Sequence, residues 1–174
     1  MTRADAGLRI GVAELRRRPG NRMHVEREVP MGDVGVSTAA TPPGAEAMVD
    51  ALIESQSTGV TVVGTVTVPW VGPCRRCLEP TGGDLVAEFS EVFSDRPDGA
   101  DLLAFDGDAV DLTQSVRDAV VLGLPLAPLC REDCPGPEPE AFPVAREGDG
   151  AEPPVDPRWA ALDELRFDPG TSDG

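Results

Sequence analysis

The sequence predicts an α+β fold, in which a small antiparallel β-sheet carries one main packed helix and is followed by a mobile acidic, proline-rich segment and a short C-terminal helix. Several stretches alternate apolar and polar residues with the period of two that is typical of half-buried strands. One longer stretch has apolar residues at helical spacing. Because the 174 residues include no Tyr, five Phe and two Trp, we expect a core made mainly of Val, Leu and Ala.

The N-terminal part of the chain predicts two strands and a loop. In residues 8–12, Leu, Ile and Val alternate with Arg and Gly, which indicates a first strand. Pro19-Gly20 marks a turn, and a short alternating stretch over 25–29 indicates a second strand. Residues 32–44 are small, include prolines and show no periodicity, so we interpret them as a connecting loop.

The strongest strand signals lie in the middle of the chain. Apolar residues share one parity from Ala47 to Ile53, and after a turn over 55–59 a Val- and Thr-rich stretch alternates over 60–70. Together these stretches predict an antiparallel hairpin. We expect Gly82-Gly83 to form the next turn, before a further strand over 85–93 returns toward the sheet.

One main helix is predicted over 112–124. Asp111 is a suitable N-cap, and Gln114 follows three residues later, as in a capping box. Pro125 is expected to stop the helix. The apolar residues of the buried face follow one another at four-residue spacing: Leu112, Val116, Val120 and Leu124.

These elements predict a single α+β domain over residues 1–134. Residues 135–155 are rich in Pro, Glu, Asp and Gly, and such a composition buries too little apolar surface to offset its ordering entropy, so we expect a flexible segment. A short docking helix is predicted over 156–166, because Asp156 can cap it and Pro157 suits its first position. Apolar residues follow there at helical spacing, namely Trp159, Leu162 and Leu165.

The charge of the chain limits how it can contact nucleic acid. Its 31 acidic and 15 basic residues give a net charge of -16, which repels a phosphate backbone at long range. Any contact with RNA is therefore expected to be local. The first residues lack an apolar stretch of signal-peptide length, and no later run is long enough to span a bilayer. We therefore expect a cytoplasmic protein that does not enter membranes.

Four cysteines form two close pairs. Cys74 and Cys77 follow a predicted strand, and Cys130 and Cys134 follow the end of the predicted helix, so each pair lies in a turn, as zinc-ribbon ligands do. In the cytoplasm such pairs are metal ligands or redox thiols more often than disulfides. We expect one structural zinc ion held by all four, and free thiols or a catalytic dithiol remain open alternatives.

The residues give little support for catalysis. A hydrolytic zinc site needs an open coordination position and a nearby base, but the single histidine, His24, is far in sequence from every cysteine. No carboxylates are spaced as an acid and base pair, and no glycine-rich phosphate loop is present. We therefore expect a non-catalytic protein without a small-molecule substrate. The alternative is an enzyme, either a zinc hydrolase or a dithiol oxidoreductase in which Arg75 and Arg76 lower a thiol pKa.

Two groups of arginines are candidate contacts for RNA or for a protein partner. The first contains Arg16, Arg17 and Arg18 together with Arg22, and the second contains Arg75 and Arg76. The alternative is that these side chains are solvated and balance an acidic surface. That acidic surface is itself suited to a basic ribosomal protein.

Several segments carry a resemblance to a known family. An alternating strand over 60–70 leads into Pro73-Cys74-Arg75-Arg76-Cys77-Leu78-Glu79-Pro80, and an acidic strand then runs to Phe93. The predicted helix ends in Leu122-Gly123-Leu124-Pro125-Leu126-Ala127-Pro128-Leu129-Cys130. In these segments the chain resembles the YceD family, which is linked to accumulation of large-subunit ribosomal RNA in bacteria and plastids. Residues 15–20 and 156–162 resemble the leading and trailing segments of actinobacterial members.

The resemblance implies a role in the synthesis, processing or stability of large-subunit ribosomal RNA, without a known catalytic activity. The partners it implies are that RNA, its precursor particles, or a basic ribosomal protein. One departure bears on the metal. Many relatives continue past the second cysteine pair with a Gly-Leu-Cys-x-x-Cys-Gly run, whereas residues 136–142 contain no cysteine. Either the four remaining cysteines close one site, or this member has lost its metal.

Overall fold

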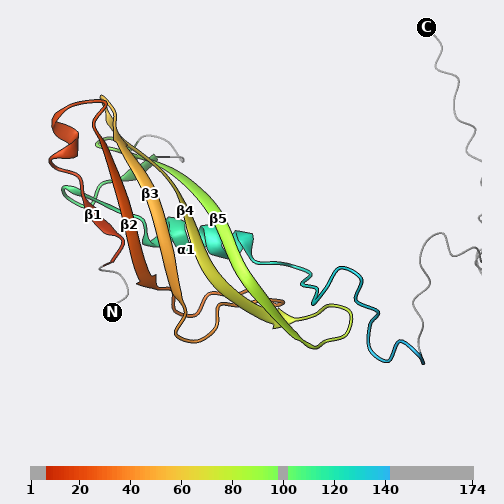
Figure 1. Cartoon of the computed structure of the whole chain (residues 1–174). Helices are drawn as coiled ribbons and strands as arrows, with labels where there is room; N and C mark the ends of the chain where they lie inside the picture. The colour runs from red at the N-terminus through yellow and green to blue at the C-terminus, as the bar shows by residue number, and fades with distance from the viewer. Residues whose placement is uncertain (1–6, 98–101, 142–174) are drawn as a thin grey trace, which may run out of the picture.

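A computed structural model describes residues 7–97 and 102–141, which form a curled five-stranded sheet, a separate two-stranded sheet and one α-helix (Figure 1). The five strands lie in the order β2-β3-β4-β5-β6, and β1 pairs with β7. Neighbouring strands are antiparallel except β5 and β6, which are parallel. The elements are β1 (Arg9–Gly11), the 3-10 helix η1 (Leu15–Arg17), β2 (Arg22–Pro30), β3 (Glu46–Ser55), β4 (Gly59–Pro73), β5 (Pro80–Ser94), β6 (Leu102–Ala104), β7 (Ala109–Asp111) and α1 (Thr113–Gly123).

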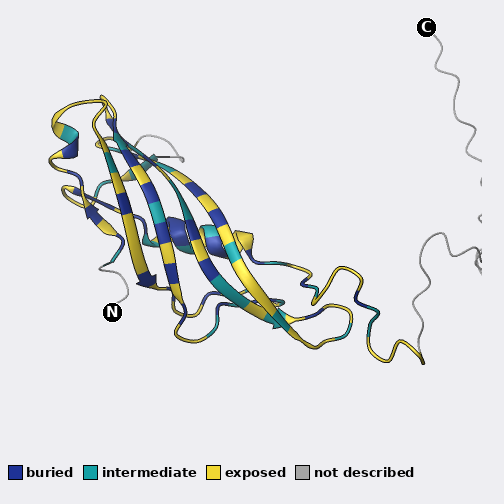
Figure 2. Cartoon of the chain, viewed as in Figure 1, coloured by how far each residue is buried: buried dark blue, intermediate teal, exposed yellow. Residues whose placement is uncertain are grey.

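The core lies between the sheet and α1. Residues of one parity on β3, β4 and β5 are buried, and those of the other parity are mostly exposed, so dark and light bands alternate along each strand in Figure 2. The side chains buried from the sheet are mainly valines, as the composition predicts. The helix covers them with Leu112, Val116 and Val120, all fully buried. Its last residue, Gly123, lies against the side chains of Leu85 and Ala87 on β5.

The α+β class is confirmed, but the sheet is larger than predicted. β4 and β5 each have 15 residues, and β2 runs from Arg22 to Pro30 rather than over 25–29. The first strand pairs with β7 and stays outside the main sheet. β6 and β7 were not predicted, because their sequences, Leu-Leu-Ala and Ala-Val-Asp, lack the regular alternation that indicates β1. The expected turn at Gly82-Gly83 is wrong.

Both glycines lie within β5, opposite Val71 and Trp70 of β4. Neither reverses the chain. Gly82 serves close packing, since a Cβ there would lie 2.5 Å from the Trp70 carbonyl oxygen, whereas a Cβ on Gly83 would lie 3.5 Å from Trp70 Nε1. The reversal occurs instead between Pro73 and Pro80, at the first cysteine pair. A glycine pair in a sequence does not distinguish these two uses.

The predicted helix begins and ends close to its expected limits. The Asp111 carboxylate accepts a hydrogen bond from the Thr113 backbone N–H at 2.9 Å, as a capping side chain does. Gln114 does not reach back to complete a capping box, because its side chain donates to Asp118 at 2.7 Å. Of the predicted flexible segment over 135–155, only the first seven residues are described, and the helix predicted over 156–166 lies outside the described residues. Among described helices, none has the length and apolar character needed to cross a membrane.

Gly64 provides a test of how tightly the sheet is packed. A Cβ at this position would lie 2.5 Å from the Asp50 carbonyl oxygen and 2.8 Å from Cζ of Phe89. We expect Gly64→Ala to lower the free energy of unfolding by about 1–3 kcal/mol, because neither neighbour can move without disturbing the sheet. Gly11→Ala is the control, since a Cβ there meets no atom within 4 Å. Equal urea midpoints for the two variants would contradict this packing.

His24 on β2 provides a pH test of the β2–β3 pairing. Its Nε2 lies 2.9 Å from Asp50 Oδ1, and this hydrogen bond, together with the charge of the carboxylate, raises the pKa of His24 above 6.5. The pair therefore stabilises the fold fully below pH 6.5, and this contribution is lost as pH rises through the raised pKa. NMR titration should show the pKa of His24 falling in Asp50→Asn and unchanged in Asp84→Asn. A value at or below 6.5 in the unmodified protein would refute the pairing.

Candidate metal centre

The first cysteine pair lies in the tight turn that joins β4 to β5. The Cys74 N–H donates to the Glu79 carbonyl at 2.8 Å, and the Leu78 N–H donates to the Cys74 carbonyl at 2.9 Å. Leu78 has a φ of 65°, a left-handed conformation that non-glycine residues rarely adopt. These features close the turn and bring the sulfurs of Cys74 and Cys77 within 4.8 Å of each other.

The second cysteine pair lies in the irregular chain that follows α1. The backbone becomes extended at Leu124, and the chain then runs alongside the first turn (Figure 1). The Arg75 N–H donates to the Pro128 carbonyl at 2.8 Å, which joins the two segments directly. A turn in which the Cys134 N–H donates to the Arg131 carbonyl at 3.2 Å then places the second pair beside the first.

The four sulfurs form one compact cluster, in which all lie within 4.8 Å of one another. Cys74 Sγ is 3.8 Å from Cys134 Sγ, and Cys77 Sγ is 3.8 Å from Cys130 Sγ. Four sulfurs bound tetrahedrally at about 2.3 Å from a zinc ion lie about 3.8 Å from one another, so the cluster fits this metal. A disulfide needs an S–S distance of about 2.05 Å, so the four thiols are free.

The surroundings of the cluster restrict access to it. Cys74 and Cys134 are buried, Cys77 is partly buried and Cys130 is exposed. Arg76 donates from Nη1 to the Cys134 carbonyl at 2.8 Å, and so bridges the two turns from outside. The sequence suggested Arg76 as a contact for RNA or a protein partner, or as a residue that lowers a thiol pKa. It did not predict this hydrogen bond, because nothing in the spacing of the motif shows which carbonyl comes near Arg76.

The thiols differ in their tendency to ionise. Hydrogen bonds from the backbone of Cys77, and then of Cys130, lower the pKa of Cys74 to about 6. The hydrogen bond with the Cys134 side chain, together with the neighbouring side chains of Cys74 and Cys77, raises the pKa of Cys130 to about 12. One thiolate therefore forms easily, while a further negative charge at Cys130 is opposed. A divalent cation relieves such an accumulation of charge, which is how metal binding becomes coupled to thiol deprotonation.

The arrangement of ligands decides which metal chemistry is open to the cluster. Four cysteines can fill a tetrahedral shell and leave no position for a reacting water, as in structural zinc sites. The single histidine, His24, lies on β2 and pairs with Asp50, so it does not join the cluster. The four cysteines can therefore hold a metal ion in a closed site.

The two arginine groups lie at opposite ends of the long hairpin. Arg75 and Arg76 are exposed at the cysteine turn, whereas η1 lies near the other end, where the Gly20 N–H donates to the Ser55 carbonyl at 2.7 Å. The length of β4 corresponds to about 45 Å between these ends, at about 3.3 Å per residue. The structure therefore does not bring the two groups together.

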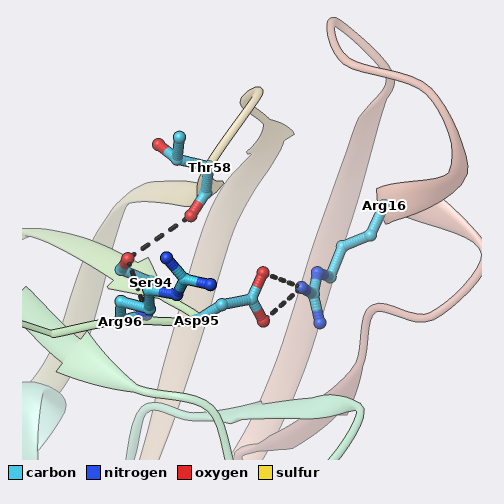
Figure 3. Close-up of polar contacts among 5 residues, drawn as sticks. All are labelled: Arg16, Thr58, Ser94, Asp95 and Arg96. Carbon is cyan, nitrogen blue, oxygen red and sulfur yellow. Dashed lines mark hydrogen bonds and ion pairs between the residues drawn. The ribbon is translucent and has the colours of Figure 1, made fainter.

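The first arginine group is largely engaged within the protein. Arg16 Nη2 lies 2.5 Å from both carboxylate oxygens of Asp95 (Figure 3), and its guanidinium lies 4.1 Å from the centre of the Phe105 ring. Beside it, Ser94 and Thr58 join the ends of the neighbouring strands (Figure 3). Arg17 pairs with Glu14 at 2.6 Å, and Arg18 is exposed.

Comparison with known proteins gives one family and several relatives. The family model described as large ribosomal RNA subunit accumulation protein YceD matches residues 62–166, a range that contains all four cysteines. Uncharacterized proteins of Mycobacterium bovis and Mycobacterium tuberculosis are each 38% identical over 168 residues, covering 91% of this chain and 81% of the relative. One from Mycobacterium leprae is 35% identical, covering 88% and 75%. No solved structure is significantly similar to the chain.

The cysteine cluster predicts a measurable metal content. Mass spectrometry of protein purified without chelator should find about one zinc ion per chain, with the thiols protected until unfolding. Removing the metal should raise hydrogen exchange at the turn near Cys74 and in the segment near Pro128, while the centres of β3 and β4 stay protected. Cys74→Ser should behave as the metal-free protein does. Leu126→Ser, which changes an exposed residue of the same segment, should keep its zinc.

Freely reactive thiols in metal-free protein of undiminished thermal stability would refute a structural metal site. If Cys74→Ser and Leu126→Ser lose zinc equally, the conformation of the segment after α1, rather than its cysteine sulfurs, controls how zinc is retained.

Proposed function

This chain belongs to the YceD family of large ribosomal RNA subunit accumulation proteins, and on that premise we propose that it is a non-catalytic factor that supports the synthesis, processing or stability of large-subunit ribosomal RNA. The single observation that carries the non-catalytic part is the closed group of four sulfurs. Such a group suits a structural zinc ion, which stabilises a fold without binding a reacting water.

The position of the cluster supports a structural role. It joins the turn between β4 and β5 to the segment after α1, two parts of the chain that otherwise meet through few contacts, including the Arg75–Pro128 and Arg76–Cys134 hydrogen bonds. Few large apolar side chains are buried near this turn, since Val71 and Leu78 are exposed. A metal ion there supplies the cross-link that a hydrophobic core supplies elsewhere.

An enzymatic alternative has less support. In dithiol oxidoreductases the reactive cysteine usually lies at a helix N-terminus, which favours the thiolate, whereas Cys74 and Cys77 lie in the turn between two strands. The lowered pKa of Cys74 is the one observation that favours thiol chemistry, and it is equally expected of a metal ligand. A zinc hydrolase would need one of the four cysteines to leave the metal.

We further propose that the protein acts in the cytoplasm on large-subunit RNA, on its precursor particles or on a basic ribosomal protein. Arg75 is the best placed of the candidate RNA contacts, because its side chain is exposed and forms no hydrogen bond or ion pair among the described residues. Arg16 and Arg17 already pair with carboxylates. Arg18 is exposed and remains a candidate RNA contact.

Depletion of the protein in a bacterium that encodes it tests this proposal. We expect the ratio of large-subunit to small-subunit ribosomal RNA to fall, and to recover when the unmodified chain is expressed. Arg75→Ala should restore the ratio less well than Arg96→Ala, an exposed arginine at the opposite end of the hairpin. The proposal fails if the ratio does not change on depletion. Equal rescue by the two variants would remove Arg75 from the contact.

A further inference from the structure

The face of the five-stranded sheet that points away from α1, here called the outer face, is not covered by any other described element. Figure 1 shows α1 behind the sheet, on its other side. The exposed large apolar side chains of the outer face include Met48 47%, Leu52 41%, Val63 53% and Val86 63%. Single exposed apolar residues are common on protein surfaces, but a connected group of them often marks a binding surface.

The strand register arranges this group in two neighbouring rows. Met48 lies opposite Thr67, which lies opposite Val86, so one row crosses three strands. Four residues along, Leu52 lies directly opposite Val63. Between these rows lies a row with Asp50, Thr65 and Glu88. A shallow groove of about 370 Å³ follows this row, lined by Asp50, Val63, Thr65, Glu88 and Ser90 among others.

The outer face is strongly acidic. Two of its carboxylates have partners on the same face, since Glu54 pairs with Arg22 and Asp50 pairs with His24. Five more carboxylates on β2, β3 and β5 have no hydrogen-bond or ion-pair partner among the described residues: Glu26, Glu28, Glu46, Asp84 and Glu88. Arg22 is the one arginine on this face among those residues. The sheet therefore presents apolar rows separated and bordered by unpaired negative charge.

We propose that the outer face docks a protein segment rich in Arg or Lys that also carries apolar side chains. The carboxylates attract the basic groups and set their positions, and the apolar rows bury the remaining side chains. Nucleic acid and anionic membranes are disfavoured, because both would bring phosphates against seven carboxylates. A second copy of the chain is disfavoured for the same reason, since two such faces repel each other.

This inference deepens the proposed function, because basic segments are the kind of protein partner that a factor acting on ribosomal precursors would meet. It depends on the proposed function only for where the protein would meet such a partner. The docking surface itself is inferred from the exposure, register and charge of its side chains. Binding of a pure peptide therefore tests the docking face separately, and its failure would leave the role in RNA accumulation standing.

The probe is a fluorescent 12-residue peptide of alternating Arg and Val, with two control peptides in which Glu replaces Arg or Ser replaces Val. We expect the Arg-Val peptide to bind more tightly than either control, with affinity falling as salt is raised. NMR shifts on binding should concentrate on β3, β4 and β5 residues of the outer face. Shifts confined to the cysteine turn or to η1 would overturn the proposal.

Two sets of variants separate a defined surface from a general charge effect. Glu26→Gln, Glu28→Gln and Glu88→Gln together should weaken binding at least tenfold. The matched control carries Asp108→Asn, Glu132→Gln and Glu140→Gln, which remove the same charge from exposed positions off this face, and it should change binding less than threefold. Val63→Ser with Val86→Ser should weaken the Arg-Val peptide but leave binding of the Arg-Ser peptide unchanged. Equal losses in the two charge variants would overturn the proposal, and so would an unchanged affinity in the valine variant.

Discussion

The inner face of a long, curled hairpin must be kept from water, and the chain has a single described helix of eleven residues with which to cover it. The helix reaches as far as Leu85 and Ala87 on β5, and β4 and β5 continue beyond that point to Pro73 and Pro80. At the other end η1 adds Leu15 to the cover. On the side of the cysteine turn, the loop between β2 and β3 adds Met31 and Val34 and pairs with β4 through Ala40 and Val71. The four cysteines meet beyond this loop, at the tip of the hairpin, where Val71 and Leu78 are exposed.

The sequence predicts the parts of this structure that rest on periodicity. Alternation of Val with Thr identifies β4, and the spacing of Leu112, Val116 and Val120 identifies α1, because both patterns reflect burial on one side of an element. Features that depend on contacts between segments distant in the sequence could not be predicted from it. The Arg16–Asp95 pair and the Arg76–Cys134 hydrogen bond join residues that no local pattern connects. The cysteine cluster was only partly predictable. Each pair can be recognised in the sequence, but the contact between the two pairs depends on the tertiary structure.

Charge is distributed in a way that composition alone does not reveal. A net charge of -16 suggests a uniformly acidic surface. In the structure, unpaired carboxylates lie on the outer face of the sheet, and the exposed arginines Arg75 and Arg76 lie at the tip of the β4–β5 hairpin. The molecule therefore presents exposed arginines, beside the exposed Glu79, at one tip of the hairpin and a carboxylate-rich face on the sheet.

The pairing of β6 with β5 has a consequence for solubility. β6 covers only Val92, Phe93 and Ser94, so the backbone edge of β5 from Pro80 to Glu91 has no strand beside it among the described residues. An open edge of this length invites strands of other molecules to add to the sheet and begin aggregation. The side chains along it oppose such growth, because Pro80 lacks an N–H and Asp84, Glu88 and Glu91 would face their own copies in a stack. The negative charges along this edge of the hairpin therefore also oppose fibril-like self-association.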